Sequence, residues 1–308
     1  MPSEDQQKLR SVAERTVKRL AARRSIAFYR DRHILPGMSG EAKVIAQDYL
    51  ASFATDRLLT RSTSRYPDFS LNDGYAIAHL IRDLRRARGE TVVGRKIGGT
   101  NPATYHLTGA TGPVWNFMFD STVRALPNGE GTFSIGKFRQ SKIEPELVLH
   151  ICETPQPGMD EAELLQCVDR VAPAFEIVFS PFSDWKVRPA DATAAFGLHQ
   201  AALIGPWCEI ASNRAGWGEL LKSFEVTLSN DRGDKRVGVG SNVLGSPIFA
   251  LKAIVDDISR HPDWTPVSVG EVVTTGTITD PMPVLPDETW TTAISGAPLS
   301  GLRLRIVS

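Results

Sequence analysis

KIEPELVLH, at residues 142–150, is the segment from which both the central sheet and its chemistry can be predicted. Polar and apolar residues alternate and then give way to an apolar run, a pattern that predicts a β-strand. Side chains two positions apart project from the same face of a strand, so Glu144 and Glu146 should point together. A hard cation such as Mg²⁺ or Mn²⁺ would relieve their repulsion. A solvated strand face is the alternative, and from this pair alone it is the more common case.

A further acid lies in the apolar run VAPAFEIVF at residues 171–179, where Glu176 is the single charge. Acidic side chains are rarely buried without a partner. Glu176 could instead face solvent or pair with an arginine. Taken together with Glu144 and Glu146, it favours a metal site built from three carboxylates.

Composition limits the class of protein. The 308 residues are enough for one large domain or two small ones, and Lys plus Arg balance Asp plus Glu at 35 each. The charge balance gives no support for a nucleic-acid or membrane partner. No apolar stretch has the length of a membrane span, and the charged first residues do not resemble a secretory signal. The cysteines, Cys152, Cys167 and Cys208, lack metal-site or disulfide spacing, which suits a reducing compartment and a cytoplasmic location.

Helical patterns dominate the first part of the chain. Residues 4–30 predict a strongly basic helix, interpreted as a solvated or subunit-contacting element within an extension over residues 1–38. A Pro- and Gly-containing break follows it. Apolar spacing then predicts a helix over residues 41–59, and SLND at 70–73 predicts the cap of another that ends near Gly89.

Short apolar strands separated by Pro- and Gly-rich turns dominate the remainder. Helices are predicted over residues 160–171 and 246–258, and further strands over 271–277 and 302–307. The fold class is therefore α+β. We expect one catalytic domain over residues 39–308, helical over 39–90 and built from a β-rich, twisted body over 91–308.

Lys96 lies in the glycine-punctuated stretch TVVGRKIGGT at residues 91–100. This stretch is not a phosphate-binding loop, since the G-K-[S/T] ending is missing. The glycines would let the backbone pass close to a ligand. Lys96 could hold a substrate carboxylate or transfer a proton, or its stem could lie buried with the ammonium at the surface.

Several segments together resemble the 2-keto-4-pentenoate hydratases and related 2-oxo-enoate decarboxylases of the fumarylacetoacetate hydrolase superfamily. They occur in the family's order between about residue 41 and the C-terminus, at residues 92–102 (VVGRKIGGTNP), 142–146 (KIEPE), 173–178 (PAFEIV), 183–185 (SDW), 244–247 (LGSP) and 270–276 (GEVVTTG). The resemblance implies a twisted β-rich roll of the superfamily type. It also implies that Glu144, Glu146 and Glu176 hold one Mg²⁺ or Mn²⁺, with Lys96 nearby and Thr275 and Gly276 beside the substrate.

The implied chemistry is coherent. A 2-oxo acid presents a carboxylate oxygen and its C2 oxygen as a bidentate chelate, and a Lewis acid there would stabilise the enolate that forms as protons move along the chain. Lys96 would neutralise charge or transfer the proton.

The chain departs from the family pattern at two places. The acid after the lysine strand, Asp120, is one position early, so it is either an acid or base for catalysis or the cap of a turn. The family's Asp-Asn-Ala-Ser run is replaced by a stretch that contains Phe196 and Leu198, which implies a more apolar pocket. His199 follows, as a further candidate acid or base or as a structural histidine.

The predicted function is a metal-dependent lyase that hydrates a 2-hydroxy-2,4-dienoate, the tautomer of a 2-oxo-enoate, to a 4-hydroxy-2-oxo acid in the breakdown of aromatic or other ring compounds. A decarboxylase of a 2-oxo-enedioate and a C–C hydrolase of an acylpyruvate are the alternative enzymes. A non-catalytic scaffold is disfavoured, because a scaffold has no use for a cluster of repelling acids. The expected partners are a small-molecule substrate and further copies of the chain in a homo-oligomer.

Overall fold

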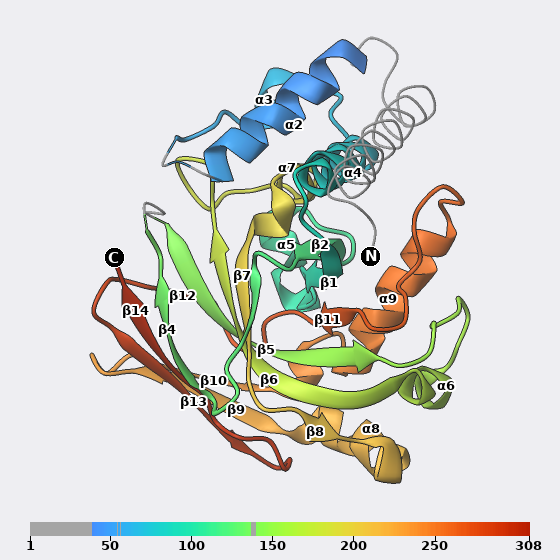
Figure 1. The fold of residues 1–308 in the computed structure, drawn as a ribbon, viewed down its shortest axis with the longest axis vertical. Coiled ribbons are helices and arrows are strands. Elements are labelled where there is room, and N and C mark those ends of the chain that lie inside the picture. Colours follow the sequence, from blue (N-terminus) through green and yellow to red (C-terminus); the bar gives the residue numbers. More distant parts are fainter. Residues whose placement is uncertain (1–38, 54, 56, 137–139) are drawn as a thin grey trace, which may run out of the picture.

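The computed structural model describes residues 39–53, 55, 57–136 and 140–308. The predicted basic helix at residues 4–30, and the extension that contains it, lie outside these ranges, so the domain division stays a prediction. Within them the α+β class is confirmed. Helices gather at one end of the molecule and at its flank, and a strongly curled β body fills the rest (Figure 1).

A nine-stranded mixed sheet forms the centre of the described part, with the strand order β2-β1-β11-β5-β6-β7-β3 and with β12 and β8 added to β5 and β6. Its strands are β1 (Val92–Gly98), β2 (Val114–Phe119), β3 (Val123–Ala125), β5 (Ser141–Ile151), β6 (Val168–Phe179), β7 (His199–Ile204), β8 (Cys208–Glu209), β11 (Val272–Thr274) and β12 (Met282–Pro283). The longest pair, β5 and β6, is antiparallel and aligns Glu144 with Glu176.

A second sheet has the order β10-β9-β13-β14-β4 among the described residues. Its strands are β4 (Glu130–Ser134), β9 (Glu225–Asn230), β10 (Lys235–Val239), β13 (Thr289–Ser295) and β14 (Arg303–Val307). Ile143 and Phe175, from the face of β5 and β6 opposite to the glutamates, share one buried apolar cluster with Trp290 and Leu304 of the second sheet. The back of the central sheet is thus sealed, and its acidic face is left for a site.

The helices cover the remaining edges. They are α2 (Ser39–Phe53), α3 (Ser62–Arg65), α4 (Leu71–Ala87), α5 (Tyr105–Thr108), α6 (Glu161–Gln166), α7 (Pro189–Ala194), α8 (Arg214–Ser223) and α9 (Pro247–Ser259), with short 3-10 turns η1 (Pro102–Thr104), η2 (Phe196–Leu198), η3 (Ala211–Asn213) and η4 (Gly240–Asn242). Helix α4 begins at the predicted cap, where Ser70 and Asp73 bond each other's backbone N–H groups reciprocally. Within the described residues, no helix is long and apolar enough to cross a membrane.

Two predicted helix boundaries are wrong. The helix expected over residues 160–171 ends at Gln166, because the chain from Val168 onward pairs with β5 as strand β6. Such long-range pairing overrides local helical spacing. The helix expected to reach residue 59 ends at Phe53, and the Leu59 N–H donates instead to the Pro181 carbonyl, 2.7 Å away.

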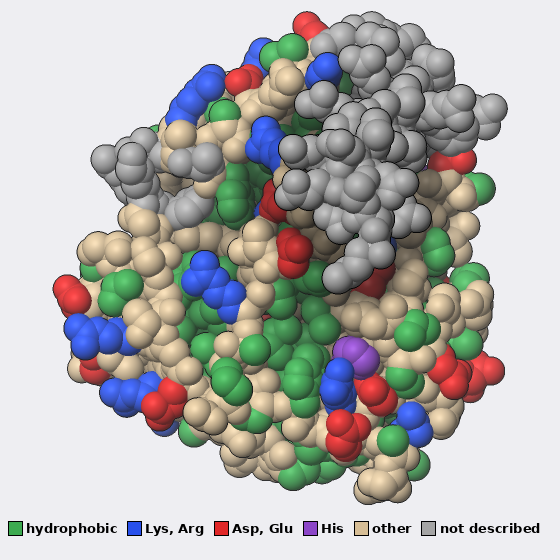
Figure 2. All heavy atoms as spheres, viewed as in Figure 1, with side chains coloured by type: hydrophobic (Ala, Val, Ile, Leu, Met, Phe, Trp, Pro, Cys, Tyr) green, Lys and Arg blue, Asp and Glu red, His purple; other side chains and the backbone are tan. Residues whose placement is uncertain are grey.

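The charge distribution agrees with the balanced composition. On the face shown in Figure 2, acidic and basic side chains are interspersed, and apolar side chains gather near its middle. The residues of this face that the structure describes form no single-sign basic stripe of the kind typical of nucleic-acid-binding proteins.

Candidate metal centre and substrate pocket

Three carboxylates converge on the acidic face of β5 and β6. Glu144 and Glu146 are two residues apart on β5, and Glu176 stands directly opposite Glu144 on β6. One carboxylate oxygen from each lies within 4.8 Å of the others. Glu176 is fully buried and Glu146 is 2% exposed. The structure therefore brings together the residues that the sequence singled out as a metal site.

Burial makes this cluster costly without a cation. Burial raises the pKa of Glu144 to about 7, and it raises the pKa of Glu146 well above its ordinary value, with the charge of Glu176 adding to the effect. Among the described residues, Oε1 of Glu146 and Oε2 of Glu176 are buried without a hydrogen-bond partner. Carboxylate oxygens are the donors that Mg²⁺ and Mn²⁺ prefer, so the residues present fit such an ion.

Lys96 of β1 points into the same site. Its Nζ donates to the Gly197 carbonyl at 2.9 Å and lies 3.3 Å from Oε2 of Glu176. Burial alone would lower the pKa of Lys96, but the neighbouring carboxylates raise it above its ordinary value, so the ammonium stays charged. The side chain is 4% exposed, and this burial excludes the alternative in which the ammonium reaches the surface.

His199 lies behind the cluster, although the sequence suggested an acid or base beside the substrate. Its Nδ1 lies 2.7 Å from Oε1 of Glu176, and its Nε2 lies 3.0 Å from the Thr122 hydroxyl. Burial lowers the pKa of His199 despite the nearby carboxylate, so the ring is neutral. Because an ionised carboxylate only accepts, Nδ1–H donates to Glu176, while Nε2 lies beside the Thr122 hydroxyl, which is also within hydrogen-bond distance of the Phe119 carbonyl. Both ring nitrogens are therefore engaged, and the geometry suits positioning of Glu176.

Two other predicted residues lie away from the site. Asp120 occupies an exposed turn at the end of β2, and its carboxylate accepts a hydrogen bond from the N–H of Thr91, just before β1, at 3.1 Å. Phe196 is buried against Phe53 and Phe179, with ring centroids 5.0 and 6.3 Å away, rather than in the pocket wall.

The remaining predicted residues support the site in different ways. Leu198 lines the cavity. The Gly276 N–H donates to Oε2 of Glu146 at 2.9 Å, and the Thr275 hydroxyl donates to the Leu147 carbonyl. Gly276 has φ +99°, and a Cβ there would lie 2.0 Å from the Thr100 hydroxyl, so only glycine fits. These two residues thus hold the acidic strand and do not line the cavity.

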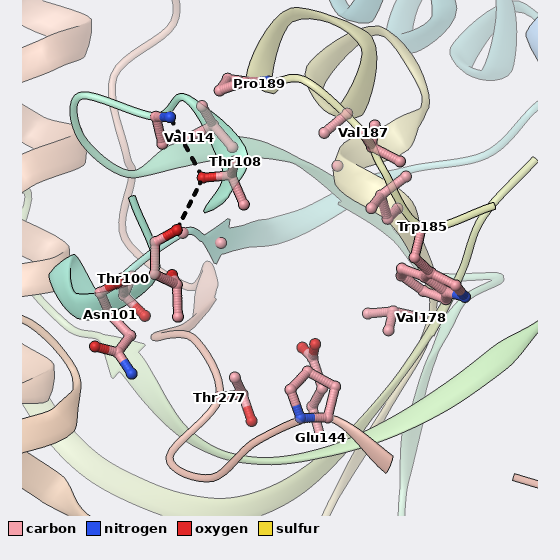
Figure 3. A pocket seen from close by; sticks show the side chains of 18 of the residues that line it. Thr100, Asn101, Thr108, Val114, Glu144, Val178, Trp185, Val187, Pro189 and Thr277 are labelled. Carbon is pink, nitrogen blue, oxygen red and sulfur yellow. Dashed lines mark hydrogen bonds between the residues drawn. The ribbon is translucent and has the colours of Figure 1, made fainter. Parts of the chain in front are cut away.

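A cavity of about 280 Å³ opens in front of Lys96 and Glu144. Figure 3 shows Thr100, Asn101 and Thr108 on one side of it, with Val178, Trp185 and Val187 on the other and Glu144 at its floor. The polar side comes from η1, α5 and the residues before them, and the apolar side from β6 and the loop that follows. The pocket can therefore orient a small molecule with one polar and one apolar edge.

Sequence reasoning missed Lys142 and the hydroxyls of Thr277 and Thr279 as pocket-lining residues. Lys142 precedes Glu144 by two positions, so the strand alternation that paired the glutamates also places it on their face. The threonines carried no comparable signal, because they follow the last matching segment in an irregular loop.

Comparison with known proteins identifies the lineage. No protein-family model matches the chain. It is 33% identical over 209 residues to the 2-hydroxypent-2,4-dienoate hydratase of Pseudomonas putida, covering 66% of this chain and 88% of that protein. The chain belongs to the 2-keto-4-pentenoate hydratase family. The hydratase family expected from the sequence is thereby confirmed.

Other relatives of this hydratase-family chain include decarboxylases. It is 26% identical over 241 residues to the 4-oxalocrotonate decarboxylase of Pseudomonas sp. (strain CF600), covering 77% of this chain and 87% of that protein. The solved 4-oxalocrotonate decarboxylase of Pseudomonas putida G7, complexed with magnesium and adipate, superposes with a TM-score of 0.80 at 21% identity. That superposition covers 90% of this chain and all of the other, and it establishes a shared fold.

Proposed function

We propose that the protein is a divalent-metal-dependent lyase that adds water to a 2-hydroxy-2,4-dienoate, or its 2-oxo-enoate tautomer, and yields a 4-hydroxy-2-oxo acid in aromatic catabolism. The observation that carries the proposal is the convergence of Glu144, Glu146 and Glu176 beside the charged Lys96, next to a cavity that Lys96 and Glu144 line. Hydratases among the relatives support the reaction class.

Glu144, Glu146 and Glu176 would hold the ion, Mg²⁺ or Mn²⁺. When bound, such an ion supplies Lewis-acid chemistry, polarising substrate oxygens and offsetting negative charge. His199 fixes the orientation of Glu176 through Nδ1–H, and Gly276 fixes that of Glu146. These bonds limit the freedom of the carboxylates, as supporting hydrogen bonds do around metal ligands generally.

Lys96 is the residue that would handle charge and protons on the substrate. Its Nζ has three donors, of which the Gly197 carbonyl takes one and Glu176 attracts another. The remaining donor faces the cavity. There it would bind a substrate oxygen as negative charge develops, and it could give or accept the proton that moves along the conjugated chain.

A decarboxylase of a 2-oxo-enedioate is the second candidate, supported by decarboxylases among the relatives. C–C hydrolysis has less support, because it needs a base for water and both nitrogens of His199 already have partners. A role as a non-catalytic scaffold would not explain why three acidic side chains lie buried together. We also propose a homo-oligomer, from the family likeness, and a cytoplasmic location, which the three free cysteines fit.

The test is an assay of the full-length chain after treatment with a chelator and again after addition of MgCl₂ or MnCl₂. Loss of the dienol absorbance of a 2-hydroxy-2,4-dienoate would report hydration, with 2-hydroxypenta-2,4-dienoate and the dicarboxylate 2-hydroxyhexa-2,4-dienedioate tested in parallel. Carbon dioxide release from 2-oxohex-3-enedioate would report decarboxylation, and pyruvate release from an acylpyruvate would report hydrolysis. We expect metal-dependent hydration to be fastest. A chain that binds neither ion and turns over none of these compounds would contradict the proposal.

A further inference from the structure

We propose that Lys142, held against Trp185, forms a subsite for a second carboxylate, so that the preferred substrate is a 2-oxo dicarboxylate. The inference rests on the proposed function, because it assumes that the 2-oxo acid end of the substrate lies at the glutamate cluster. It concerns the far end of the molecule and holds for hydration or decarboxylation.

The position of Lys142 sets the length of the ligand. Lys142 and Glu144 project from one face of β5, and their backbone positions are about 6.6–6.8 Å apart along the strand. A six-carbon 2-oxo diacid separates its C2 oxygen from its distal carboxylate by a similar distance. With its 2-oxo acid end at the glutamates, such a molecule would bring the distal carboxylate to Lys142.

The ammonium of Lys142 is available for an anion. Its Nζ lies 4.2 Å from the Trp185 ring centroid, and both residues line the cavity. Among the described residues, no carboxylate forms an ion pair with it. A half-buried cation stacked on an indole ring is pre-oriented, and it gains more from an ion pair than a fully solvated lysine would.

The apolar wall around Lys142 increases the difference in affinity between a ligand that ends in a carboxylate and one that ends in a methyl group. Val178 lies opposite Lys142 in the strand pairing, and Val187 and Leu198 complete the apolar side. In such surroundings a carboxylate bound to Lys142 is weakly screened. A ligand that ends in a methyl group would instead displace water from the ammonium without supplying a hydrogen-bond acceptor in its place.

The experiment compares two probes of equal chain length, 2-oxoadipate and 2-oxohexanoate, which differ only in a terminal carboxylate and a terminal methyl group. Binding of each to the Mn²⁺-loaded full-length protein would be measured by titration calorimetry. We expect 2-oxoadipate to bind about tenfold to a hundredfold more tightly, the range for a charge-assisted hydrogen bond. Lys142→Met should bring the ratio of the two dissociation constants close to one, whereas Lys142→Arg should preserve the preference.

Lys235→Met is the matched control, because it removes an exposed lysine on β10 far from the cavity and should leave the ratio unchanged. Mn²⁺ affinity and thermal unfolding of each variant would show that the site and the fold are intact. Equal binding of the probes by the wild type, or an undiminished preference in Lys142→Met, would overturn the subsite and leave the proposed function standing. Failure of both probes to bind the metal-loaded protein would remove the proposed function itself.

Discussion

Glu144 and Glu176 face each other across the β5–β6 pair, with their carboxylates on the same side of the sheet. Like charges directly opposite each other destabilise a sheet, and the fully buried position of Glu176 increases the cost. Lys96 supplies one compensating positive charge at 3.3 Å from Glu176. Only when Glu144 and Glu146 lose their protons does the cluster become net negative, and a divalent ion would then offset that charge.

Glu146→Gln should separate metal binding from folding. The amide removes one negative charge, and its carbonyl can still accept the hydrogen bond from the Gly276 N–H. We expect the metal-free variant to unfold a few degrees higher than the wild type at pH 8. Its Mg²⁺ affinity should fall by more than about 100-fold, since loss of a supporting residue alone typically costs 10–100-fold.

Thermal unfolding and calorimetric Mg²⁺ titration would measure both effects. Glu225→Gln provides the control, because it removes an exposed acid on β9 and should change neither quantity. If Glu146→Gln binds Mg²⁺ as the wild type does, Glu146 is not a ligand.

The raised carboxylate pKa values predict a pH-dependent response to metal. The pKa of Glu144 is about 7 in the folded chain, against an ordinary value of 4.5, so the metal-free native state holds more protons than the unfolded state between these values. Its free energy of unfolding should therefore fall as the pH rises through this window. The cation competes with those protons, so its affinity should rise over the same range.

The measurement is the increase in melting temperature that about 5 mM MgCl₂ produces at pH 5.5 and at pH 8. We expect the larger increase at pH 8. In Glu144→Gln the metal-free melting temperature should depend less on pH across this window. An increase of equal size at both pH values would show that Glu144 and Glu146 are already ionised in the metal-free protein.

The sequence predicted the features that depend on local spacing. The alternation that paired Glu144 with Glu146 holds along β5, and the Ser70–Asp73 cap begins α4 as expected. The convergence of Glu176 with this pair was expected from its isolation in an apolar run, since a buried acid needs a partner. The sequence argument says only that Glu176 requires a partner, whereas the β5–β6 register places Glu176 opposite Glu144.

Features that depend on long-range packing were harder to predict from the sequence. The stretch from Val168 has helical spacing, but its pairing with β5 makes it a strand. Phe196 and Leu198 flank Gly197 in the same short turn and both contact one apolar cluster, yet only Leu198 also lines the cavity. Both residues have positive φ values, +60° and +63°, which are rare for bulky side chains, and no sequence pattern reports such a backbone.

His199 is expected to act through Glu176. His199→Leu removes the donor at 2.7 Å and should weaken Mn²⁺ binding by about 10–100-fold, as other losses of ligand-supporting bonds do. His199→Asn keeps an N–H group near the position of Nδ1 and should recover most of the affinity. Mn²⁺ titration followed by electron paramagnetic resonance measures this without turnover.

The pH dependence of turnover distinguishes positioning from direct proton transfer. If His199 only positions Glu176, His199→Asn should keep the wild-type pH profile of kcat/KM. Loss of the basic or acidic limb of that profile in His199→Asn, with Mn²⁺ affinity intact, would instead assign the proton transfer to His199.

Gly197 should prove essential to the position of Lys96. Its carbonyl accepts the Lys96 hydrogen bond, its φ is +63°, and a Cβ there would lie 2.8 Å from Lys96 Cδ and 3.1 Å from Asn116 Cβ. Gly197→Ala should therefore cost about 1–3 kcal/mol of stability, and displacement of the ammonium should lower kcat at least tenfold. Gly158→Ala is the matched control, because Gly158 also has a positive φ, +83°, with open space around its Cβ position, and does not line the cavity. It should show the backbone cost alone, with kcat nearly unchanged. Equal kcat values for the two variants would show that the placement of Lys96 does not depend on this glycine.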